Sequence, residues 1–504
     1  MGDRGTHERP TFERHIARQQ PTNPTNQRTH QQGTQHEGVT QGFQEKVHRI
    51  SMGVSPAGTM PRVSTQFARP ALRRLPTRSS RPVQILVRRL LPLVFRVQGL
   101  EVCNGNAAEG LAKAFQAHQA GETTLLIAFR HPSTRDPLVL ADLFWNRTAN
   151  TARQRNSPLA RPVELRFLYD RGIPIWAGPL IGWLLQRCGG IAIHRGRLDR
   201  PALAEARQVL AQGRYPLVIA PEGATNNLST EMAPLEPGVA QLAFWAAEDL
   251  EKSGQTQDLQ VLPVSLTYSW RQQNWSALDA RLQALERHLG VQGEPLNEEW
   301  DDPHQVHRQR FLRIGDALID ALEHLERLQH EPDQPLVHRI TTYRLHGLAK
   351  AESHFGLKAA GTLQERCRRI EQAAWDRIYR EGLEQLPPLE RSIADWEARE
   401  ADLQLSRMRL VEHFICVTGQ SISDEANFDR LAEMLLLLEE TIGWIEDRPW
   451  NSSPSLGPQR VELSLGEPMA VLPRLNSYRH NRRKAVQAFM ADLQQALHQL
   501  MDGD

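Results

Sequence analysis

The sequence is poor in the features that mark several common classes of protein. No apolar run in its 504 residues approaches the roughly 20 residues that a membrane-spanning helix requires, and the mean hydropathy is -0.50. The first residues lack the apolar core of a secretory signal, so we expect a protein that faces the cytosol. The cysteines have neither metal-type nor redox-type spacing, which fits reduced thiols and argues against a metal site. They are Cys103, Cys188, Cys367 and Cys416.

Charge of one sign is not in excess either. Lys and Arg total 60 against 59 for Asp and Glu, a formal net charge of +1, so no global field draws the chain onto nucleic acid. Three catalytic signatures are also missing: a Gly-x-Ser-x-Gly elbow, a glycine-rich phosphate-binding loop and a His-Glu-x-x-His helix. A covalent serine hydrolase, an NTPase and a zinc protease therefore lose support, and we expect no nucleic-acid partner.

The N-terminal part divides into two regions of different character. Residues 1–80 are rich in Gln, Thr, Arg, His, Pro and Gly and have almost no apolar periodicity, so we predict a disordered tail. Residues 83–95 are apolar but interrupted by Arg88, Arg89 and Pro92, and they are too short to cross a bilayer. This segment either lies on a membrane surface or forms an ordinary buried helix.

A regular alternation follows within residues 81–270. Five apolar runs of strand length are separated by helical patterns, which indicates an α/β domain whose sheet is covered by helices on both faces. The runs are residues 123–129, 165–169, 190–193, 216–220 and 261–267. Polar residues cluster where these strands end, and such ends are where sites form in α/β folds.

The pattern from residue 271 to residue 456 is helical. Apolar stripes with helical spacing run from Phe311 to Leu325 and from Phe428 to Ile445. Ser423 and Asp424 offer an N-cap to the second of these helices, and Pro449 ends it. We therefore predict that residues 271–456 are a large all-helical insertion in the α/β domain.

The α/β pattern resumes near the end of the chain. Val461, Leu463 and Leu465 alternate with polar residues as in a strand, and a turn follows at Gly466. A helix is predicted from residue 481 to residue 501. Residues 457–504 are therefore predicted to return to the α/β domain as a strand and a C-terminal helix.

The first segment that carries chemistry reads Ala-Phe-Arg-His-Pro-Ser-Thr-Arg-Asp. His131 follows a predicted strand and Asp136 precedes an apolar helical stretch, so both lie at one strand exit. A histidine that acts as a base needs a partner to fix its tautomer, and a carboxylate one short loop away can provide it. The other interpretation is a helix-capping Asp136 beside a surface His131.

Three further segments place polar or unusual residues at strand ends. Arg195 follows the strand at residues 190–193, and its guanidinium would suit phosphate oxygens unless it is simply solvated. Glu222 and Gly223 form a turn after the strand at residues 216–220. The carboxylate could accept hydrogen bonds from acceptor hydroxyls, and the glycine could let a ligand or the backbone approach closely. The alternative is a plain turn with a capping glutamate. Pro263 inside a strand indicates an edge or a bulge.

These four blocks occur in the order found in lysophosphatidate and glycerol-3-phosphate acyltransferases. The sequence resembles that family from about residue 97 to residue 267, and the turn at Gly466, Glu467 and Pro468 resembles a further block near the end of such domains. The helical insertion has no part in the resemblance. The resemblance implies an α/β fold with a glycerolipid acyltransferase-type sheet covered by helices.

The same resemblance implies an activity. A fatty acyl group would pass from acyl-CoA or acyl-carrier protein to a hydroxyl of a lysophospholipid or glycerol phosphate, with no cofactor and no metal. His131 would be the general base and Asp136 its orienting partner, and in a direct mechanism the acceptor hydroxyl loses its proton to His131 as it attacks the thioester. Arg195, Glu222 and Gly223 would bind the acceptor.

Two departures from the family pattern affect acceptor binding. Arg130 stands where the family usually has Asn, and Glu222-Gly223-Ala224-Thr225-Asn226 replaces the usual Glu-Gly-Thr-Arg-Ser. The second departure removes an arginine that would contact phosphate, so another lysolipid or a glycolipid becomes a possible acceptor. Arg130 and Arg135 are the predicted substitutes for that arginine.

A lipid substrate implies a membrane surface as partner, and therefore a cytoplasmic, peripheral membrane protein. Residues 83–95 and residues 173–185, with Trp176 and Trp183, are the candidate contacts. The main alternative is a non-catalytic, membrane-associated lipid-binding scaffold whose helical insertion recruits partners. A lipid hydrolase that uses the same base on water is a third possibility.

Overall fold

The computed structural model describes residues 67–72, 74–194, 199–255, 257–291, 303–330, 333–417, 426–446 and 450–502. The predicted disordered tail, residues 1–80, therefore lies mostly outside the described residues. The prediction is wrong for its last part, because the chain is packed from residue 67 onward. Ala68 is buried and its N–H donates to Asp395, and β1 (Arg69–Pro70) pairs in parallel with β8 (Tyr379–Arg380). Contacts with the distant helical insertion, which local composition does not reveal, order this segment.

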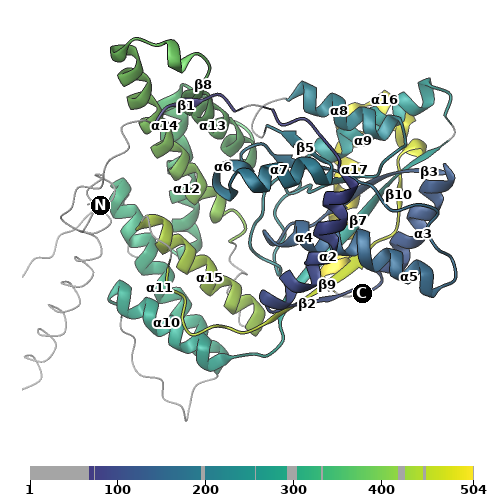
Figure 1. Cartoon of the computed structure of the whole chain (residues 1–504). Coiled ribbons are helices and arrows are strands. Elements are labelled where there is room, and N and C mark those ends of the chain that lie inside the picture. The colour runs from purple at the N-terminus through teal and green to yellow at the C-terminus, as the bar shows by residue number, and fades with distance from the viewer. Residues whose placement is uncertain are drawn as a thin grey trace, which may run out of the picture.

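The centre of the fold is a mixed sheet, as the α/β prediction requires (Figure 1). Its strand order is β2-β9-β7-β3-β6-β4-β5, with β10 also paired to β7. The strands are β2 (Leu100–Cys103), β3 (Thr123–Phe129), β4 (Arg166–Asp170), β5 (Gly190–Ile193), β6 (Leu217–Ile219), β7 (Asp258–Trp270), β9 (Gln459–Leu465) and β10 (Met469–Ala470). From β7 to β5 all neighbours are parallel, whereas β9 runs antiparallel to β7. All five predicted strands of the first region are present, and β2 and β10 were not predicted.

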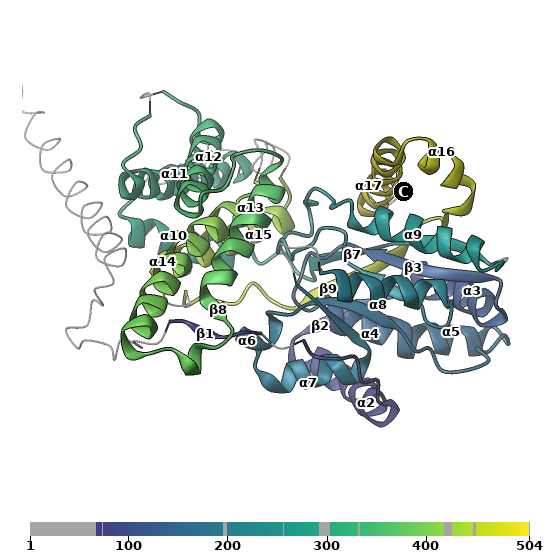
Figure 2. The same cartoon turned by 90° about the horizontal axis from the view of Figure 1, so that it is seen from above.

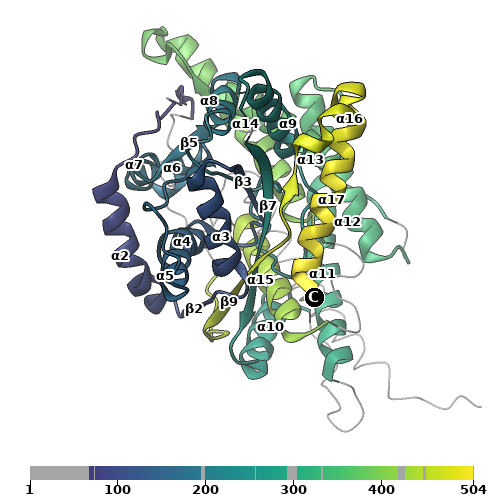
Figure 3. The same ribbon diagram turned by 90° about the vertical axis from the view of Figure 1, so that its right-hand side faces the viewer.

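Helices cover both faces of this sheet (Figures 2 and 3). They do so because successive side chains of a strand point to opposite faces, and in these strands the side chains on both faces are apolar. In β3, Leu126 and Ala128 pack toward α8 (Arg200–Ala211), α9 (Gly238–Lys252), α16 (Leu475–His480) and α17 (Arg482–Asp502). Leu125 and Ile127 pack toward the opposite layer. That layer contains α2 (Arg81–Val97), α3 (Ala107–Ala120), α4 (Asp136–Asp142), a π-helical turn (Leu143–Arg147) and α5 (Thr148–Gln154). The short helices α6 (Ile173–Ala177) and α7 (Pro179–Cys188) lie beside α2.

Between β7 and β9 the described residues form six α-helices, which lie beside the carboxyl end of β7 (Figures 1 and 2). They are α10 (Trp275–Leu289), α11 (Pro303–Glu326), α12 (Leu336–Phe355), α13 (Leu363–Ile378), α14 (Pro388–His413) and α15 (Phe428–Ile445). One apolar core joins α10, α11 and α15, and a second joins α12, α13 and α14 with the segment around Ala68. We refer to residues 271–456 as the helical insertion.

Both predicted helical stripes are buried inside this insertion. In α11, Phe311, Ile314 and Leu318 lie in the core, as the spacing predicted. The N-cap of α15 is Asn427, whose side chain accepts the N–H of Arg430. The predicted caps, Ser423 and Asp424, and the predicted helix end, Pro449, lie outside the described residues.

Strand β9 enters the sheet between β2 and β7, and Trp270 at the end of β7 is paired with Gln459 at the start of β9. Pro263 does not mark a sheet edge, since β7 has neighbours on both sides. It lies where one neighbour of β7 changes from β10 to β9: Val261 pairs with Met469 and Val264 with Leu465. Two residues of β7 therefore lie opposite three of the partner, an irregularity of the bulge type that the sequence predicted. A residue without an N–H is tolerated at such a change of partner.

Among the helices of the described residues, none combines the length and the apolarity that a membrane-spanning helix needs.

Candidate active site

His131 and Asp136 meet at the carboxyl end of β3. The strand ends at Phe129, and α4 begins at Asp136. Nδ1 of His131 lies 2.9 Å from Oδ2 of Asp136, and the N–H of Ser133 donates to the same oxygen. The Asp136 carboxylate is fully buried, whereas 19% of the His131 side chain is exposed. Because an ionised carboxylate can only accept, Nδ1 of His131 carries its proton and Nε2 presents a lone pair.

Tyr268, which sequence reasoning missed, completes this pair. Its hydroxyl donates to Oδ1 of Asp136 over 2.6 Å, so both carboxylate oxygens have donors. Burial and the Asp136 charge raise the pKa of Tyr268 far above its usual range, so the hydroxyl keeps its proton and remains a donor. Tyr268 reaches Asp136 because β7 is the neighbour of β3 in the sheet. Only strand order and register reveal this contact.

Glu222 holds the backbone of the site and does not face an acceptor, which corrects the role expected from the sequence. Its residue is 1% exposed. Oε1 accepts the N–H of His131 over 2.8 Å, and Oε2 accepts the N–H of Ala233 and the amide of Asn226. Burial raises the pKa of Glu222, while the Arg130 charge and these two N–H groups oppose that shift. The carboxylate therefore positions His131 by its main chain.

Gly223 is required by the turn itself. Its φ is +72°, in the left-handed region, and a Cβ placed there would lie 2.4 Å from a carboxylate oxygen of Glu236. The close approach at Gly223 is made by the carboxylate of Glu236, a group of this chain. Gly223 therefore permits the tight turn that leads from β6 to Thr225.

Arg130 does not substitute for the missing phosphate-binding arginine. The whole residue is buried, and its guanidinium donates to the carbonyl oxygens of Ser229, Leu228 and Glu231. Burial lowers the pKa of Arg130, and the charge of Glu222 is the largest opposing influence. Arg130 thus fixes the loop that follows the Glu222 turn, and it has no exposed surface in this structure with which to meet a substrate.

The other two predicted arginines have different outcomes. Arg135 lines a large cavity, with its guanidinium 4.9 Å from the centre of the Tyr268 ring and hydrogen bonded to Gln459. Arg195 lies outside the described residues. His194, the residue before it, is buried, and its ring meets the edge of Trp375 at 5.3 Å.

Thr225 approaches His131 from the side opposite Asp136. Its Oγ1 lies 3.0 Å from Nε2 of His131, and it occupies the position where the resembling family usually has arginine. Three hydrogen-bonded groups therefore lie in line, from the Thr225 hydroxyl through the imidazole to the Asp136 carboxylate. The signal in the sequence was the departure at this position, which was interpreted as a loss of phosphate binding and not as a gain of a hydroxyl.

A cavity of about 1420 Å³ lies against this arrangement. Thr225, Ser133, Arg135 and Tyr268 line it from the α/β domain, while among the described residues His131 itself does not. The helical insertion provides another wall, to which Trp375, Arg409, His413, Glu433 and Glu440 contribute. The insertion therefore forms part of the space next to the candidate catalytic groups.

Glu433 of α15 connects the insertion to the loop beyond Thr225. Its carboxylate accepts the N–H groups of Ser229 and Thr230 and the hydroxyl of Thr230. Burial raises the pKa of Glu433 to about 7, although these donors and the charge of Arg130 favour ionisation. The loop at residues 228–231 is thus held by two buried side chains: Arg130 donates to its carbonyl oxygens, and Glu433 accepts from its N–H groups.

Exposed apolar side chains gather on α2, α7 and α6, helices that pack in that order and are labelled together in Figure 3. Leu91 and Phe95 of α2 are buried against the domain, so the helix is both a core element and partly exposed. The exposed apolar side chains are Ile85, Leu86, Leu90, Leu93 and Val97 of α2 with Ile175, Leu180, Ile181 and Trp183. We call this set the α2–α7 apolar surface. The side chain of Trp176 lies outside the described residues.

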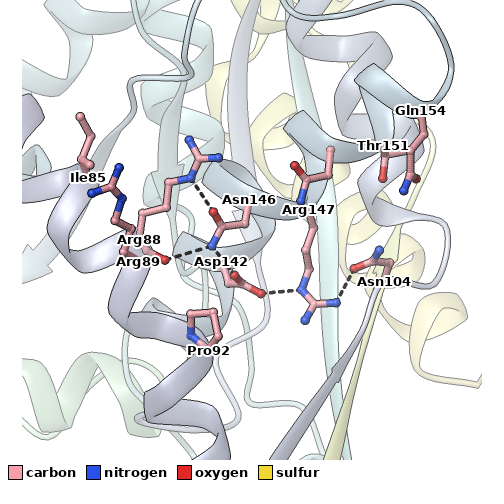
Figure 4. A pocket seen from close by; sticks show the side chains of 11 residues that line it. Ile85, Arg88, Arg89, Pro92, Asn104, Asp142, Asn146, Arg147, Thr151 and Gln154 are labelled. Carbon is pink, nitrogen blue, oxygen red and sulfur yellow. Dashed lines mark hydrogen bonds and ion pairs between the residues drawn. The ribbon is translucent and has the colours of Figure 1, made fainter.

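A polar pocket of about 870 Å³ borders α2 (Figure 4). Arg88 and Arg89 of α2 line it, and Arg88 donates to Asn146 over 2.5 Å. Arg147 on its other side is paired with Asp142 over 2.5 Å. The pocket therefore places basic groups directly beside the α2–α7 apolar surface.

Comparison with known proteins gives one match. The model of the acyltransferase family matches residues 113–267, a segment that contains His131, Asp136, the Glu222 turn and most of β7. No curated protein matches the chain. The matched segment is less than half of the chain and excludes the helical insertion and β9. Residues 113–267 are thus an acyltransferase-family domain, from the family of lysophosphatidate and glycerol-3-phosphate acyltransferases.

Proposed function

We propose that this protein transfers a fatty acyl group from acyl-CoA or acyl-carrier protein to a hydroxyl of a lysophospholipid or glycerol phosphate. The observation that carries the proposal is the contact between His131 and Asp136 beside a large cavity, within a segment that matches the acyltransferase family. His131 acts as general base through Nε2, and Asp136 holds the proton on Nδ1. The reaction would belong to glycerolipid synthesis.

The roles of the surrounding residues follow from their partners. As an attacking hydroxyl loses its proton to Nε2, positive charge develops on the imidazole 2.9 Å from the buried Asp136 carboxylate. An opposite charge at this distance stabilises the imidazolium, and no solvent reorganisation is needed at the moment of transfer. Glu222 keeps the main chain of His131 in place. No residue of this group requires a cofactor for the transfer.

Acceptor binding falls to residues that line the cavity. Three arginines line it: Arg135 from the α/β domain, Arg409 from the insertion and Arg69 from β1. A phosphate on the acceptor would pair with Arg135, which lies next to Ser133 and Tyr268. Replacement of Arg135 by glutamine should then raise the acceptor KM with little change in kcat. Unchanged kinetics would contradict this role.

Acyl transfer itself is tested with purified protein, a labelled acyl thioester and a panel of acceptors that differ in headgroup. We expect an ester product that His131→Ala abolishes and that His354→Ala, an exposed histidine of α12, leaves intact. Free fatty acid in place of ester would indicate a hydrolase that uses the same base on water. Absence of any product with every acceptor would indicate a non-catalytic lipid-binding scaffold.

Peripheral membrane binding from the cytoplasmic side is the second part of the proposal. The α2–α7 apolar surface and the adjacent Arg88 and Arg89 match an interface that holds apolar chains and anionic headgroups. The double variant Leu90→Ser and Leu93→Ser should lose flotation with anionic liposomes. Leu345→Ser removes an exposed leucine of α12 in the insertion and serves as the control. Equal flotation of both variants would contradict the proposed contact.

A further inference from the structure

The hydroxyl of Thr225 lies within hydrogen-bonding distance of the imidazole that Asp136 orients. Its Oγ1 lies 3.0 Å from Nε2 of His131, and Nδ1 of the same ring lies 2.9 Å from Asp136. Since Nδ1 carries the proton, Nε2 can only accept, so the hydrogen bond runs from the Thr225 hydroxyl to the imidazole. This is the polarity by which a base activates a hydroxyl nucleophile.

The cavity strengthens this interpretation. Thr225 lines it, and its hydroxyl is already hydrogen bonded to Nε2 of His131. A thioester in the cavity can therefore reach a hydroxyl that has a base beside it.

The position of Thr225 is held by its neighbours on both sides. Gly223 makes the turn before it, and Asn226 after it donates to Glu222 and to the carbonyl of Glu231. Glu222 in turn accepts the N–H of His131, so one carboxylate connects the nucleophile turn to the base. The hydroxyl and the imidazole therefore keep their relative position without a bound ligand, as preorganised catalysis requires.

We propose that Thr225 receives the acyl group first and that transfer proceeds through an acyl-Thr225 ester. This inference rests on the proposed function, which supplies the thioester, but it replaces a direct attack by the acceptor with two successive transfers. Thr225, which stands where the family usually has arginine, thereby has a chemical role of its own in addition to the loss of a phosphate contact.

Each transfer balances with groups already named. In the first, Nε2 of His131 takes the Thr225 proton as Oγ1 attacks the thioester carbon, the C–S bond breaks, and the thiolate leaves with that proton as a free thiol. In the second, Nε2 takes the proton of the acceptor hydroxyl as its oxygen attacks the Thr225 ester. The bond from the acyl carbon to Oγ1 then breaks, and Oγ1 recovers the proton.

The test follows both halves of the reaction. Protein mixed with acyl-CoA and no acceptor is quenched in acid, released thiol is counted, and intact mass followed by peptide mapping locates any acyl group. We expect a burst of about one thiol per protein molecule and an acyl adduct on Thr225. Initial rates with both substrates varied should give the parallel double-reciprocal lines of a ping-pong reaction.

Three variants make the result specific. Thr225→Val keeps the shape of the side chain without the hydroxyl, and it should lose the adduct and lower transfer by at least about 100-fold. Thr225→Ser should restore both, and Thr341→Val, on the far α12, should resemble the wild type. If Thr225→Val transfers like the wild type, if the adduct forms on another residue, or if the lines intersect, the acyl-Thr225 ester is refuted while the transferase function stands. If the wild type releases no thiol and makes no ester with any acceptor, the proposed function fails as well.

Discussion

Replacement of Tyr268 by phenylalanine removes one hydroxyl and leaves a buried carboxylate oxygen without its donor. The hydroxyl donates over 2.6 Å to Oδ1 of Asp136, a side chain with no exposed surface. A hydrogen bond to a charged group contributes about 1.5–3 kcal/mol, and the orphaned oxygen cannot reach water. We therefore expect Tyr268→Phe to lower the free energy of unfolding by about 2 kcal/mol.

Tyr169 of β4 is a matched control. It is also buried, but its hydroxyl has no hydrogen-bond partner among the described residues, and burial raises its pKa to about 12. Its removal loses no bond and relieves an unsatisfied polar group, so Tyr169→Phe should leave stability unchanged or raise it by up to about 1 kcal/mol. The two variants remove the same atom, and the expected difference of about 2 kcal/mol or more comes from the partner alone.

Urea unfolding at neutral pH measures this difference from the transition midpoints, provided that the slopes of the two variants agree with the wild type. Acyl transfer should fall with Tyr268→Phe and persist with Tyr169→Phe. The reason is that Tyr268, unlike Tyr169, donates to the Asp136 carboxylate that orients His131. Equal unfolding midpoints for the two variants would refute the reasoning. A Tyr169→Phe variant less stable than Tyr268→Phe would refute it too.

Three further predictions concern the loop around Thr225. Arg130→Met leaves three loop carbonyls and three nearby carboxylates without their cation, so thermal unfolding should show a loss of about 3–5 kcal/mol. A loss below about 1 kcal/mol would contradict its structural role. Glu433 has a pKa raised to about 7, so wild-type stability should fall as pH rises from about 5 to about 8, by up to about 3 kcal/mol. Glu433→Gln cannot ionise and should flatten that slope in urea unfolding; an unchanged slope would place the titration elsewhere. Gly223→Ala forces a left-handed residue against Glu236 and should cost more than the roughly 1 kcal/mol of the backbone alone, whereas Gly254→Ala, also at positive φ but in open space, should cost only that amount.

The strands of the sheet were predictable because their signal is local. The run at residues 123–129 is apolar after its first two residues and coincides with β3, and the run at residues 190–193 coincides with β5. β2 was not predicted, since Leu100–Cys103 is short and its partner β9 lies at the far end of the sequence. A strand whose pairing is so distant leaves little trace in its own residues.

The site was predictable only where its residues are close in sequence. His131 and Asp136 are joined by one short loop, and they meet as expected. Tyr268 lies in β7 and Thr225 in the loop after β6, so their contacts depend on the order of β7, β3 and β6 in the sheet. Arg130 was misassigned because a charged residue beside a catalytic histidine suggests a ligand contact. Its guanidinium donates instead to backbone carbonyls of a loop about a hundred residues later in the chain. Such contacts cannot be predicted from the types of the residues involved, because every residue has a backbone carbonyl.

The pairing of Trp270 with Gln459 has a consequence for how this chain is built. β7 and β9 are adjacent and antiparallel, so in topology they form a β-hairpin whose connecting turn has been expanded into the six helices of the insertion. A two-residue turn such as Asn-Gly at that point would restore an ordinary hairpin and excise the insertion without breaking any other connection of the sheet. On the ribosome the natural chain faces the opposite situation. β7 is synthesised first, and its open side must wait for the whole insertion to emerge before β9 can cover it.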